Sequence, residues 1–288
     1  MTRPQSAVAV VTDSTAYLPP LPAAIGGRLT VVPLAVVVNG VPGLETVDID
    51  SATVAEALGA RRVAVTTSRP SPEAFAEVYR KLLDDGADGV LSVHLSARLS
   101  GTHDAAALAA ADFGGKVEVI DTESTGMGLG FPALAAAEAA AGGGTLAEVR
   151  AAAEAAAGRT TTLFYVDTLE FLRRGGRIGA AAALLGTALS VKPILHTTSE
   201  GVVVREKVRT ASRALARLVD IAVESAGSSD VDVAVHHLAA PDRADALLTT
   251  LKERIGERLR ELYLTEVGAV VGAHVGPGMV AVVVHRVS

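Results

Sequence analysis

The sequence predicts an α/β protein of two domains, the first with a mainly parallel sheet flanked by helices and the second with a mixed sheet and helices. In the first half, short apolar runs are each followed by small polar residues and then by helical patterning, which is typical of βαβ units. In the second half a hairpin interrupts this repeat. With 288 residues, 49% of them hydrophobic, the chain can form two cores, and we expect domains at 1–160 and 161–288.

The elements of the first domain follow from the alternation of apolar runs with turn residues. Strands are expected at 7–11, 29–38, 89–95 and 117–120, because each is a short apolar run bounded by polar residues. Asn39-Gly40 predicts a hairpin turn after the strand 29–38. Helices are expected at 72–84, 101–111, 129–141 and 146–157, and the glycines at 142–144 separate the last two.

The elements of the second domain alternate in a different order. Strands are expected at 161–166, 191–196, 202–206, 231–236 and 280–286, with a hairpin across Ser199-Glu200-Gly201. Helices are expected at 169–174, 212–225 and 243–254. The apolar segment 178–191 is too short to cross a bilayer, which needs roughly 20 residues, so we expect a buried helix there.

Composition excludes several classes of function. A net charge of −6 gives no general attraction for nucleic acid, and the absence of Trp leaves few platforms for base stacking. Without cysteine the chain has no disulfide, thiolate nucleophile or Cys-based zinc site. The N-terminus lacks the long apolar region of a signal peptide, so we expect a cytoplasmic protein with no transmembrane segment.

The stretch His274-Val275-Gly276-Pro277-Gly278 is the most informative motif of the chain. It places an imidazole beside a turn whose glycines lack side chains, so that the backbone amides of Gly276 and Gly278 can approach a ligand closely. Such a turn can hold an anion. We therefore expect His274 and Gly276 to bind a small acidic head group.

The first strand ends in a carboxylate and hydroxyl groups, at Asp13-Ser14-Thr15. Ligands gather outside the carboxyl ends of the strands in open α/β sheets, which makes Asp13 and Ser14 candidates for binding. The alternative is that both side chains only cap the turn. An aspartyl-phosphate mechanism would ordinarily use a second acid two residues after Asp13, where this chain has Thr15.

A hydroxyl-rich turn precedes the helix expected at 72–84. Thr67 and Ser68 can join the unpaired N–H groups at the start of this helix on an anion. Ser71 is expected as the N-cap and Pro72 as the first helical residue. These two roles are compatible, because different residues perform them.

A second such turn precedes the helix expected at 101–111. Gly101 permits a close approach of the backbone to a ligand, and Ser100 can donate its hydroxyl. The alternative for Ser100 is a plain capping role.

Motifs for catalysis, cofactors and metals are missing from the sequence. Gly126-Met127-Gly128-Leu129-Gly130 lacks the glycine that a dinucleotide fingerprint needs at Phe131, and there is no P-loop. The G-x-S-x-G elbow of serine hydrolases is also missing, and the histidines do not have metal-ligand spacing. We therefore predict no catalytic residue, no cofactor and no metal.

Positive charge is concentrated between residues 170 and 217. This stretch holds nine basic residues and three acids, within a chain whose net charge is −6. A solvated face is one interpretation, and a docking surface for an acidic partner or a phosphate is the other. The nine basic residues are Arg173, Arg174, Arg177, Lys192, Arg205, Lys207, Arg209, Arg213 and Arg217.

Six motifs, taken in order, resemble those of the DegV family over nearly the whole chain. They are Thr12-Asp13-Ser14-Thr15, Thr67-Ser68-Arg69-Pro70-Ser71, Leu99-Ser100-Gly101-Thr102, the segment 169–178 with its Arg-Arg-Gly-Gly-Arg core, Lys192-Pro193-Ile194-Leu195 and the segment 274–278. Each motif is weak alone, and the specificity comes from their order. Members of the family are two-domain α/β proteins that bind a long-chain fatty acid between the domains, and several are the acyl-carrying subunit of bacterial fatty acid kinase.

The resemblance implies roles for particular residues. The family's carboxylate seat corresponds to Thr67 and Ser100, with His274 nearby and Arg177 as a further contact. Two positions depart from the family pattern. Arg69 stands where the family commonly has Gln, and His103 stands where it commonly has Tyr.

The resemblance further implies a non-catalytic protein that buries a long-chain fatty acid and presents its carboxylate to a separate fatty acid kinase. From its excess of positive charge, the basic segment 173–217 is the expected docking surface for this kinase. Preorganised neutral donors can hold an ionised carboxylate, and buried methylenes supply most of the affinity. The alternative is an enzyme that acts on a small carboxylated or phosphorylated substrate with Asp13 as acid or base. A third hypothesis is an interaction protein that works through the basic segment alone.

Overall fold

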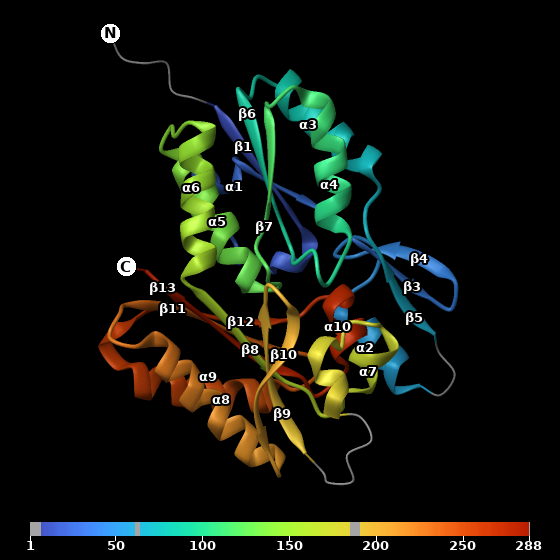
Figure 1. Ribbon diagram of the computed structural model, residues 1–288, viewed down its shortest axis with the longest axis vertical. Coiled ribbons are helices and arrows are strands. Elements are labelled where there is room, and N and C mark those ends of the chain that lie inside the picture. The colour runs from blue at the N-terminus through green and yellow to red at the C-terminus, as the bar shows by residue number, and fades with distance from the viewer. Residues whose placement is uncertain (1–6, 61–63, 185–190, 288) are drawn as a thin grey trace. The chain divides into compact units, whose positions relative to one another are not determined.

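The chain forms two compact units, shown by the computed structural model, which describes residues 7–60, 64–184 and 191–287 (Figure 1). The first unit comprises Met1–Leu34 and Arg69–Gly158, and the second comprises Ala35–Ser68 and Arg159–Ser288. The expected boundary after residue 160 therefore lies close to an observed transition. The expected first domain, 1–160, differs in one segment, because Ala35–Ser68 packs in the second unit.

The local sequence pattern does not reveal that Ala35–Ser68 belongs to the second unit, because contacts with residues far away in the sequence hold this segment there. Ser51 Oγ donates to Glu266, and Glu45 accepts from the amide of Val270. These partners lie 215 and 225 residues apart in the sequence.

The first unit is built on a parallel sheet, as predicted. Its strands are β1 (Val8–Asp13), β2 (Leu29–Val32), β6 (Gly89–His94) and β7 (Val117–Asp121), in the order β2-β1-β6-β7. All three pairings are parallel, so the carboxyl ends of the strands share one edge. The polar turns after β1 and β6 therefore emerge at the same side of this sheet.

Helices cover both faces of this sheet (Figure 1). One face carries α3 (Pro72–Asp84) and α4 (Thr102–Ala110), and the other carries α5 (Met127–Ala141) and α6 (Leu146–Gly158). Shorter helical turns are α1 (Ala23–Gly26), η1 (Ser14–Ala16) and η2 (Ala111–Phe113). The predicted helix start at Ser71 and Pro72 is confirmed, since Ser71 Oγ accepts from the amide of Ala74 at 3.2 Å.

The second unit is built on a mixed sheet in the order β10-β9-β8-β13-β11-β12. Among the strands that the structure describes in this sheet, only β11 and β12 pair in parallel. The hairpin predicted between β9 and β10 is confirmed. The strands are β8 (Thr160–Tyr165), β9 (Lys192–Thr198), β10 (Gly201–Val208), β11 (Val231–His237), β12 (Leu259–Glu266) and β13 (Val280–Arg286).

Two amphipathic helices, α8 (Ala211–Ala226) and α9 (Pro241–Ile255), supply the core on one face of this sheet. Leu218 and Leu251 from the helices pack in one cluster with Val233 and Val282 from the strands, and all four side chains are fully buried. Burial of this kind contributes roughly 1.5–3 kcal/mol for each large aliphatic side chain. The turn η4 (Gly256–Arg258) follows α9.

A small antiparallel sheet of β3 (Ala35–Val38), β4 (Val41–Leu44) and β5 (Val65–Ser68) also belongs to the second unit. The predicted hairpin at Asn39-Gly40 is confirmed, with φ angles of 51° and 85°. The single strand expected at 29–38 is wrong, because β2 and β3 lie in different sheets. Pro33 separates them, and a proline has no N–H to donate to a ladder.

Further elements of the second unit are α2 (Ser51–Gly59), α7 (Glu170–Arg174), η3 (Gly179–Leu184) and α10 (Ala269–Val275). Our sequence prediction omitted α2, β12 and α10, and it described Thr67 and Ser68 as part of a turn where the structure has the strand β5. Of the helix expected at 178–191, residues 179–184 form a 3₁₀ helix in which Ala181 and Leu184 are buried, and residues 185–190 lie outside the described part of the chain. Within the described residues, no helix combines the length and apolarity needed to span a bilayer.

Candidate functional site

The second unit brings together two residues that the sequence singled out separately. Thr67 stands on β5, and His274 stands in the last turn of α10. Thr67 Oγ1 lies 2.8 Å from His274 Nε2, although the residues are 207 positions apart in the sequence. The hydroxyl and the imidazole therefore form one hydrogen-bonded pair.

The helix that carries His274 is held at both ends. Gly268, its N-cap, has no side chain to satisfy the first N–H groups, and the buried carboxylate of Glu45 accepts from the amide of Val270 at 2.9 Å instead. Gly276, with a φ angle of 75°, ends the helix directly after the last turn. Sequence reasoning missed Glu45, because its partner lies 225 residues away.

Two adjacent glycines shape the other side of the imidazole. Gly176 has a φ angle of 71° and ends α7 in a Schellman motif, in which the amide of Arg177 donates to Leu172 at 2.9 Å. Gly175 has no such constraint, but a Cβ atom there would overlap the ring of His274. Each glycine of the Arg-Arg-Gly-Gly-Arg segment is thus required for a different reason.

Burial, with a smaller contribution from the positive charge of Arg177, lowers the pKa of His274 to about 4. The imidazole is therefore neutral at pH 7. Its Nδ1 is buried without a hydrogen-bond partner among the described residues, and buried N–H groups without partners are rare, so we assign the proton to Nε2. In this tautomer His274 donates to Thr67, and the hydroxyl proton of Thr67 remains free to donate to an anion.

The glycine-proline-glycine turn does not act as the sequence suggested. The amide of Gly276 donates to Gly272 at 2.9 Å, and that of Gly278 donates to Leu238 at 2.8 Å, so both are occupied within the fold. The expected anion contact through the amide of Gly276 therefore does not hold. The missing side chain of Gly276 instead makes room for the ring of Phe171.

The first unit presents Ser100 between β6 and α4. Its Oγ accepts from the amide of Thr102 at 3.3 Å and lies 2.9 Å from Thr102 Oγ1. Gly101, the N-cap residue of α4, provides no side-chain cap. The structure thus supports the capping role that the sequence left open for Ser100, and a ligand contact stays a prediction. Ser68, which is exposed at the end of β5, likewise stays a prediction.

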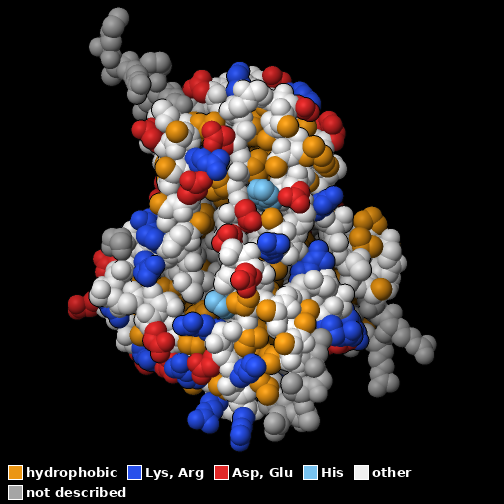
Figure 2. All heavy atoms as spheres, in the orientation of Figure 1, with side chains coloured by type: hydrophobic (Ala, Val, Ile, Leu, Met, Phe, Trp, Pro, Cys, Tyr) orange, Lys and Arg blue, Asp and Glu red, His pale blue; other side chains and the backbone are white. Residues whose placement is uncertain are grey.

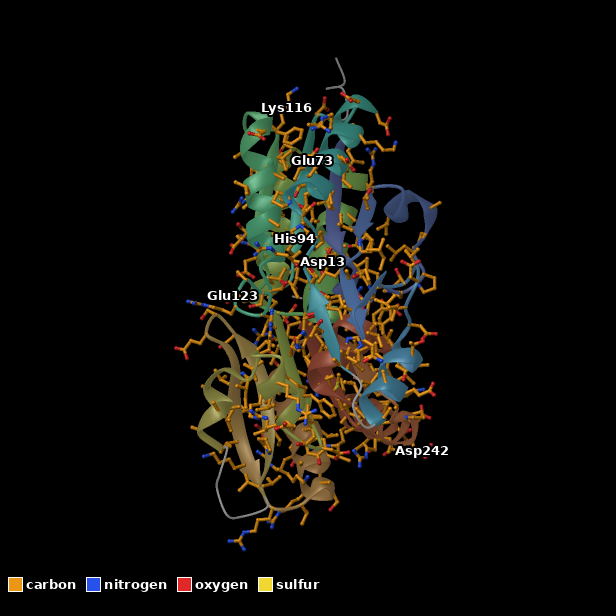
Figure 3. The ribbon with its side chains drawn as sticks, turned by 90° about the vertical axis from the view of Figure 1, so that its right-hand side faces the viewer. Asp13, Glu73, His94, Lys116, Glu123 and Asp242 are labelled. Carbon is orange, nitrogen blue, oxygen red and sulfur yellow. The ribbon has the colours of Figure 1, made fainter. Side chains whose placement is uncertain are left out.

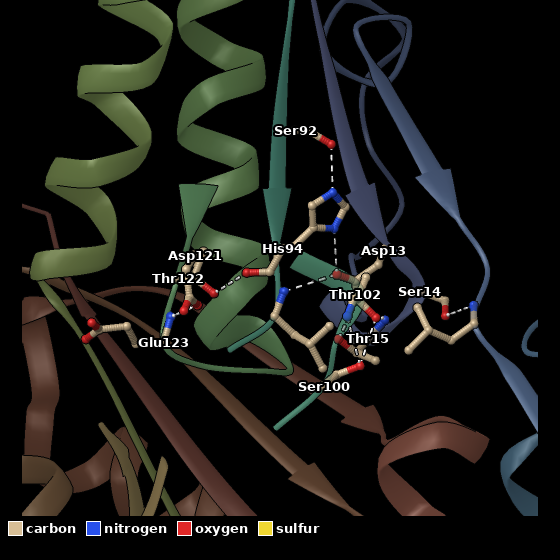
Figure 4. Close-up of polar contacts among 12 residues, drawn as sticks. Asp13, Ser14, Thr15, Ser92, His94, Ser100, Thr102, Asp121, Thr122 and Glu123 are labelled. Atoms are coloured by element: carbon tan, nitrogen blue, oxygen red, sulfur yellow. Dashed lines mark hydrogen bonds and ion pairs between the residues drawn. The ribbon is translucent and has the colours of Figure 1, made fainter. Parts of the chain in front are cut away.

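Asp13 and Ser14 are committed to the fold of the first unit. Asp13 is fully buried, and its Oδ1 accepts from both the amide and the hydroxyl of Thr15, at 3.1 and 2.6 Å. Its Oδ2 accepts from the amide of Leu95 at 3.1 Å and lies 3.0 Å from His94 Nδ1 (Figure 4). Ser14 Oγ accepts from the amide of Leu34 at 3.0 Å. These contacts favour the capping alternative over an acid–base role.

A buried chain of hydrogen bonds extends from Asp13, and we did not predict it. Tyr79 donates to Ser92 at 2.7 Å. Ser92 Oγ lies 2.7 Å from His94 Nε2 (Figure 4), and Figure 3 shows His94 beside Asp13 in the first unit. The order Ser92, His94, Asp13 matches that of a catalytic triad. All three side chains have no exposed surface, so a substrate has no access to the serine. The spacing of Ser92 and His94 in one strand, which places both on the same face, was the available signal.

No group of three or more potential metal ligands was found among the residues that the structure describes. His236 and His285 are buried, and burial lowers the pKa of each to about 4. Both imidazoles are thus neutral at pH 7 within the interior.

Comparison with known proteins places these features in a family. The model of the DegV family matches residues 7–287. A DegV domain-containing protein of Streptomyces coelicolor is 56% identical over 277 residues, which cover 96% of this chain and 98% of that protein.

Solved structures agree with this match. A DegV family protein from Thermus thermophilus, described as binding fatty acid, aligns with a TM-score of 0.89 and 35% identity over 97% of this chain and 99% of that one. DegV from Bacillus subtilis, described as a fatty acid binding protein, aligns with a TM-score of 0.86 and 31% identity over 98% and 99% of the two chains. The order of the motifs, the two α/β units and these matches together establish that the chain belongs to the DegV family.

Proposed function

We propose that this chain binds a long-chain fatty acid and presents its carboxylate to a separate kinase, without catalysing the transfer itself. Two relatives with 35% and 31% identity are described as binding fatty acid, which supports the ligand class. Thr67 and Ser100 are the proposed hydroxyl donors to the carboxylate, with Arg177 and His274 as supporting residues. A cytoplasmic location and the absence of a cofactor stay predictions.

The observation that carries the proposal is the hydrogen bond between Thr67 and His274. A neutral imidazole fixes the hydroxyl in position and leaves its proton for an acceptor. Hydrogen bonds to ionised groups are worth about 1.5–3 kcal/mol, and the donor costs little to reorganise because His274 already holds it. The tail then adds on the order of 0.8 kcal/mol for each buried methylene, before the costs of association.

Native mass spectrometry of protein expressed in bacteria tests the ligand directly. We expect a bound fatty acid in the purified protein, and uptake of oleate after its removal. A protein that carries no fatty acid and takes up none would contradict the proposal.

A pair of threonine variants tests the donor. Thr67→Val keeps the shape of the side chain and should weaken oleate binding by about tenfold to a hundredfold. Thr66→Val is the matched control, because Thr66 is the preceding residue of β5 and points to the opposite face of the strand. Equal affinities in the two variants would remove Thr67 from the site.

The docking of a kinase is proposed at three cations of the basic segment. Lys207, Arg209 and Arg213 are exposed, and their side chains have no hydrogen bond or ion pair with any residue that the structure describes. They line a hollow of about 350 Å³ beside Glu206 and Arg217. Figure 2 shows Lys and Arg side chains protruding at the end of the second unit where β9 and α8 lie.

Other cations of this segment are neutralised within the fold. Arg173 and Arg174 both pair with Glu170, at 2.7 Å, and Arg217 pairs with Glu206 at 2.8 Å. The unpaired cations are therefore the part of the segment best suited to an acidic partner.

Acyl phosphate formation, trapped with hydroxylamine, tests this docking with oleate, MgATP and the catalytic subunit of a bacterial fatty acid kinase. We expect no product from this chain alone. The double variant Arg209→Glu/Arg213→Glu should slow product formation by roughly tenfold at unchanged oleate affinity. The control Arg80→Glu/Lys116→Glu makes the same charge change on the first unit. Equal rates in both double variants would contradict docking at this surface.

A further inference from the structure

Arg69 lies directly against the loop that carries Ser100. A Cβ atom on Gly101 would stand 3.0 Å from Arg69 Cδ and 3.1 Å from Cζ, and it would overlap Nη1. The guanidinium therefore occupies the space that the missing side chain of Gly101 leaves. Both residues belong to the first unit, so this contact is internal to one compact body.

We propose that Arg69 is a specificity-determining residue, which supplies a positive charge to the ionised head group and makes this chain discriminate against lipids with an uncharged head group. The inference rests on the proposed function, because it assumes that a lipid head group binds at Ser100. It goes further by assigning a second cation, beside the Ser100 hydroxyl, in addition to the supporting residue Arg177.

The local electrostatics support a bound anion. Gly101 is the N-cap of α4, a helix of nine residues, and the amino end of a helix carries a partial positive charge. A guanidinium at that end adds a second positive feature beside the Ser100 hydroxyl. An anion at this place gains from the hydroxyl, the helix end and the guanidinium together.

The backbone at Gly101 provides a way to move the charge without removing it. Its φ angle is −76°, which any residue adopts, so alanine fits the backbone, and the three atoms nearest to its Cβ would all belong to the Arg69 side chain. Gly101→Ala should therefore displace Arg69, whereas Arg69→Gln removes its charge. The two variants change the same contact from opposite sides.

Binding of oleate and of uncharged oleyl alcohol to delipidated protein tests the proposal, with thermal melting to verify folding. For Arg69→Gln we expect oleate affinity to fall on the order of fivefold while oleyl alcohol affinity stays constant, since an exposed cation is screened by water. Gly101→Ala should act in the same direction, and about 0.5 M NaCl should shrink the difference from wild type. Arg69→Lys should retain most of the discrimination.

Arg98→Gln is the matched control, because Arg98 is exposed in the loop before Ser100 and undergoes the same change of charge. It should leave the ratio of the two affinities unchanged. If Arg69→Gln leaves that ratio unchanged in a protein that binds oleate, the role of Arg69 is overturned and the proposed function stands. If wild type binds neither lipid, both are overturned.

Discussion

Each unit contains an imidazole hydrogen-bonded to a hydroxyl group, and the two differ in whether a donor is left over. In the first unit, His94 lies between Ser92 and Asp13, and both oxygens of Asp13 accept further hydrogen bonds. In the second unit, His274 Nε2 donates to Thr67, and the hydroxyl proton of Thr67 has no acceptor among the described residues. A network in which every donor and acceptor has a partner, here called the saturated network of Asp13, Ser92 and His94, stabilises the fold. A hydrogen-bond donor without an acceptor can instead bind a ligand.

The largest expected effect comes from breaking the saturated network. Asp13→Ala leaves the amide of Leu95, the Thr15 turn and His94 without their acceptor, so we expect a loss of about 3–5 kcal/mol in the free energy of unfolding. Urea denaturation measures it. Asp112→Ala, at an exposed position of η2, is the control and should change stability by less than about 0.5 kcal/mol. A small loss in Asp13→Ala would show that the network is dispensable for folding.

Acidification tests the second imidazole. Since the pKa of His274 is lowered to about 4 from an ordinary value of 6.5, the unfolded chain binds a proton between these values that the folded chain does not. The free energy of unfolding should therefore be highest above pH 6.5 and fall as the pH drops toward 4, by at most about 3 kcal/mol from this residue.

His236 and His285 add to this loss in the same direction, because burial also lowers their pKa values. His274→Gln isolates the contribution of His274, and its stability should fall less than that of wild type over the same pH range. An equal fall in both proteins would assign the pH dependence to the other histidines.

Gly175→Ala disturbs the hydrogen-bonded pair of Thr67 and His274 without changing either of these two residues. The new methyl group would overlap the ring of His274, so we expect a loss of about 1–3 kcal/mol in stability and weaker oleate binding. Gly158→Ala is the control, because a Cβ atom there meets nothing within 4 Å. Unchanged oleate binding in Gly175→Ala would show that the position of His274 does not determine the affinity for oleate.

Tyr79→Phe is expected to have the smallest effect. It removes the terminal donor of the saturated network, at a cost of about 1 kcal/mol in the free energy of unfolding. Oleate affinity should not change, because Tyr79 is fully buried in the core of the first unit. A loss of affinity larger than the loss of stability would connect the two imidazole sites.

Much of this fold is visible in the sequence, because apolar periodicity and turn chemistry are local. The helix at 72–84 and the strand at 280–286 match α3 and β13 in both boundaries. The local pattern does not show which residues contact each other across long distances in the sequence. Thr67 and His274 were each predicted, but their hydrogen bond depends on how β5 and α10 meet.

The same limit explains the errors at the site. The glycines at 276 and 278 were expected to let backbone amides approach a ligand, but the space that their missing side chains leave is taken by Phe171 and Asp167. Glu45 was missed, because a buried acid near a hairpin has no local signature of its role at a helix end.

The path of the chain has a consequence for biosynthesis. Ala35–Ser68 leaves a ribosome early, yet its packing partners belong to Arg159–Ser288 and emerge last. The early segment therefore completes its packing only when the final helix, α10, has been made. A fragment that ends at Gly158 would contain Ala35–Ser68 without the residues that this segment packs against. A fragment in which a short linker joins residue 34 to residue 69 would contain the first unit alone, and it is the better choice for independent production.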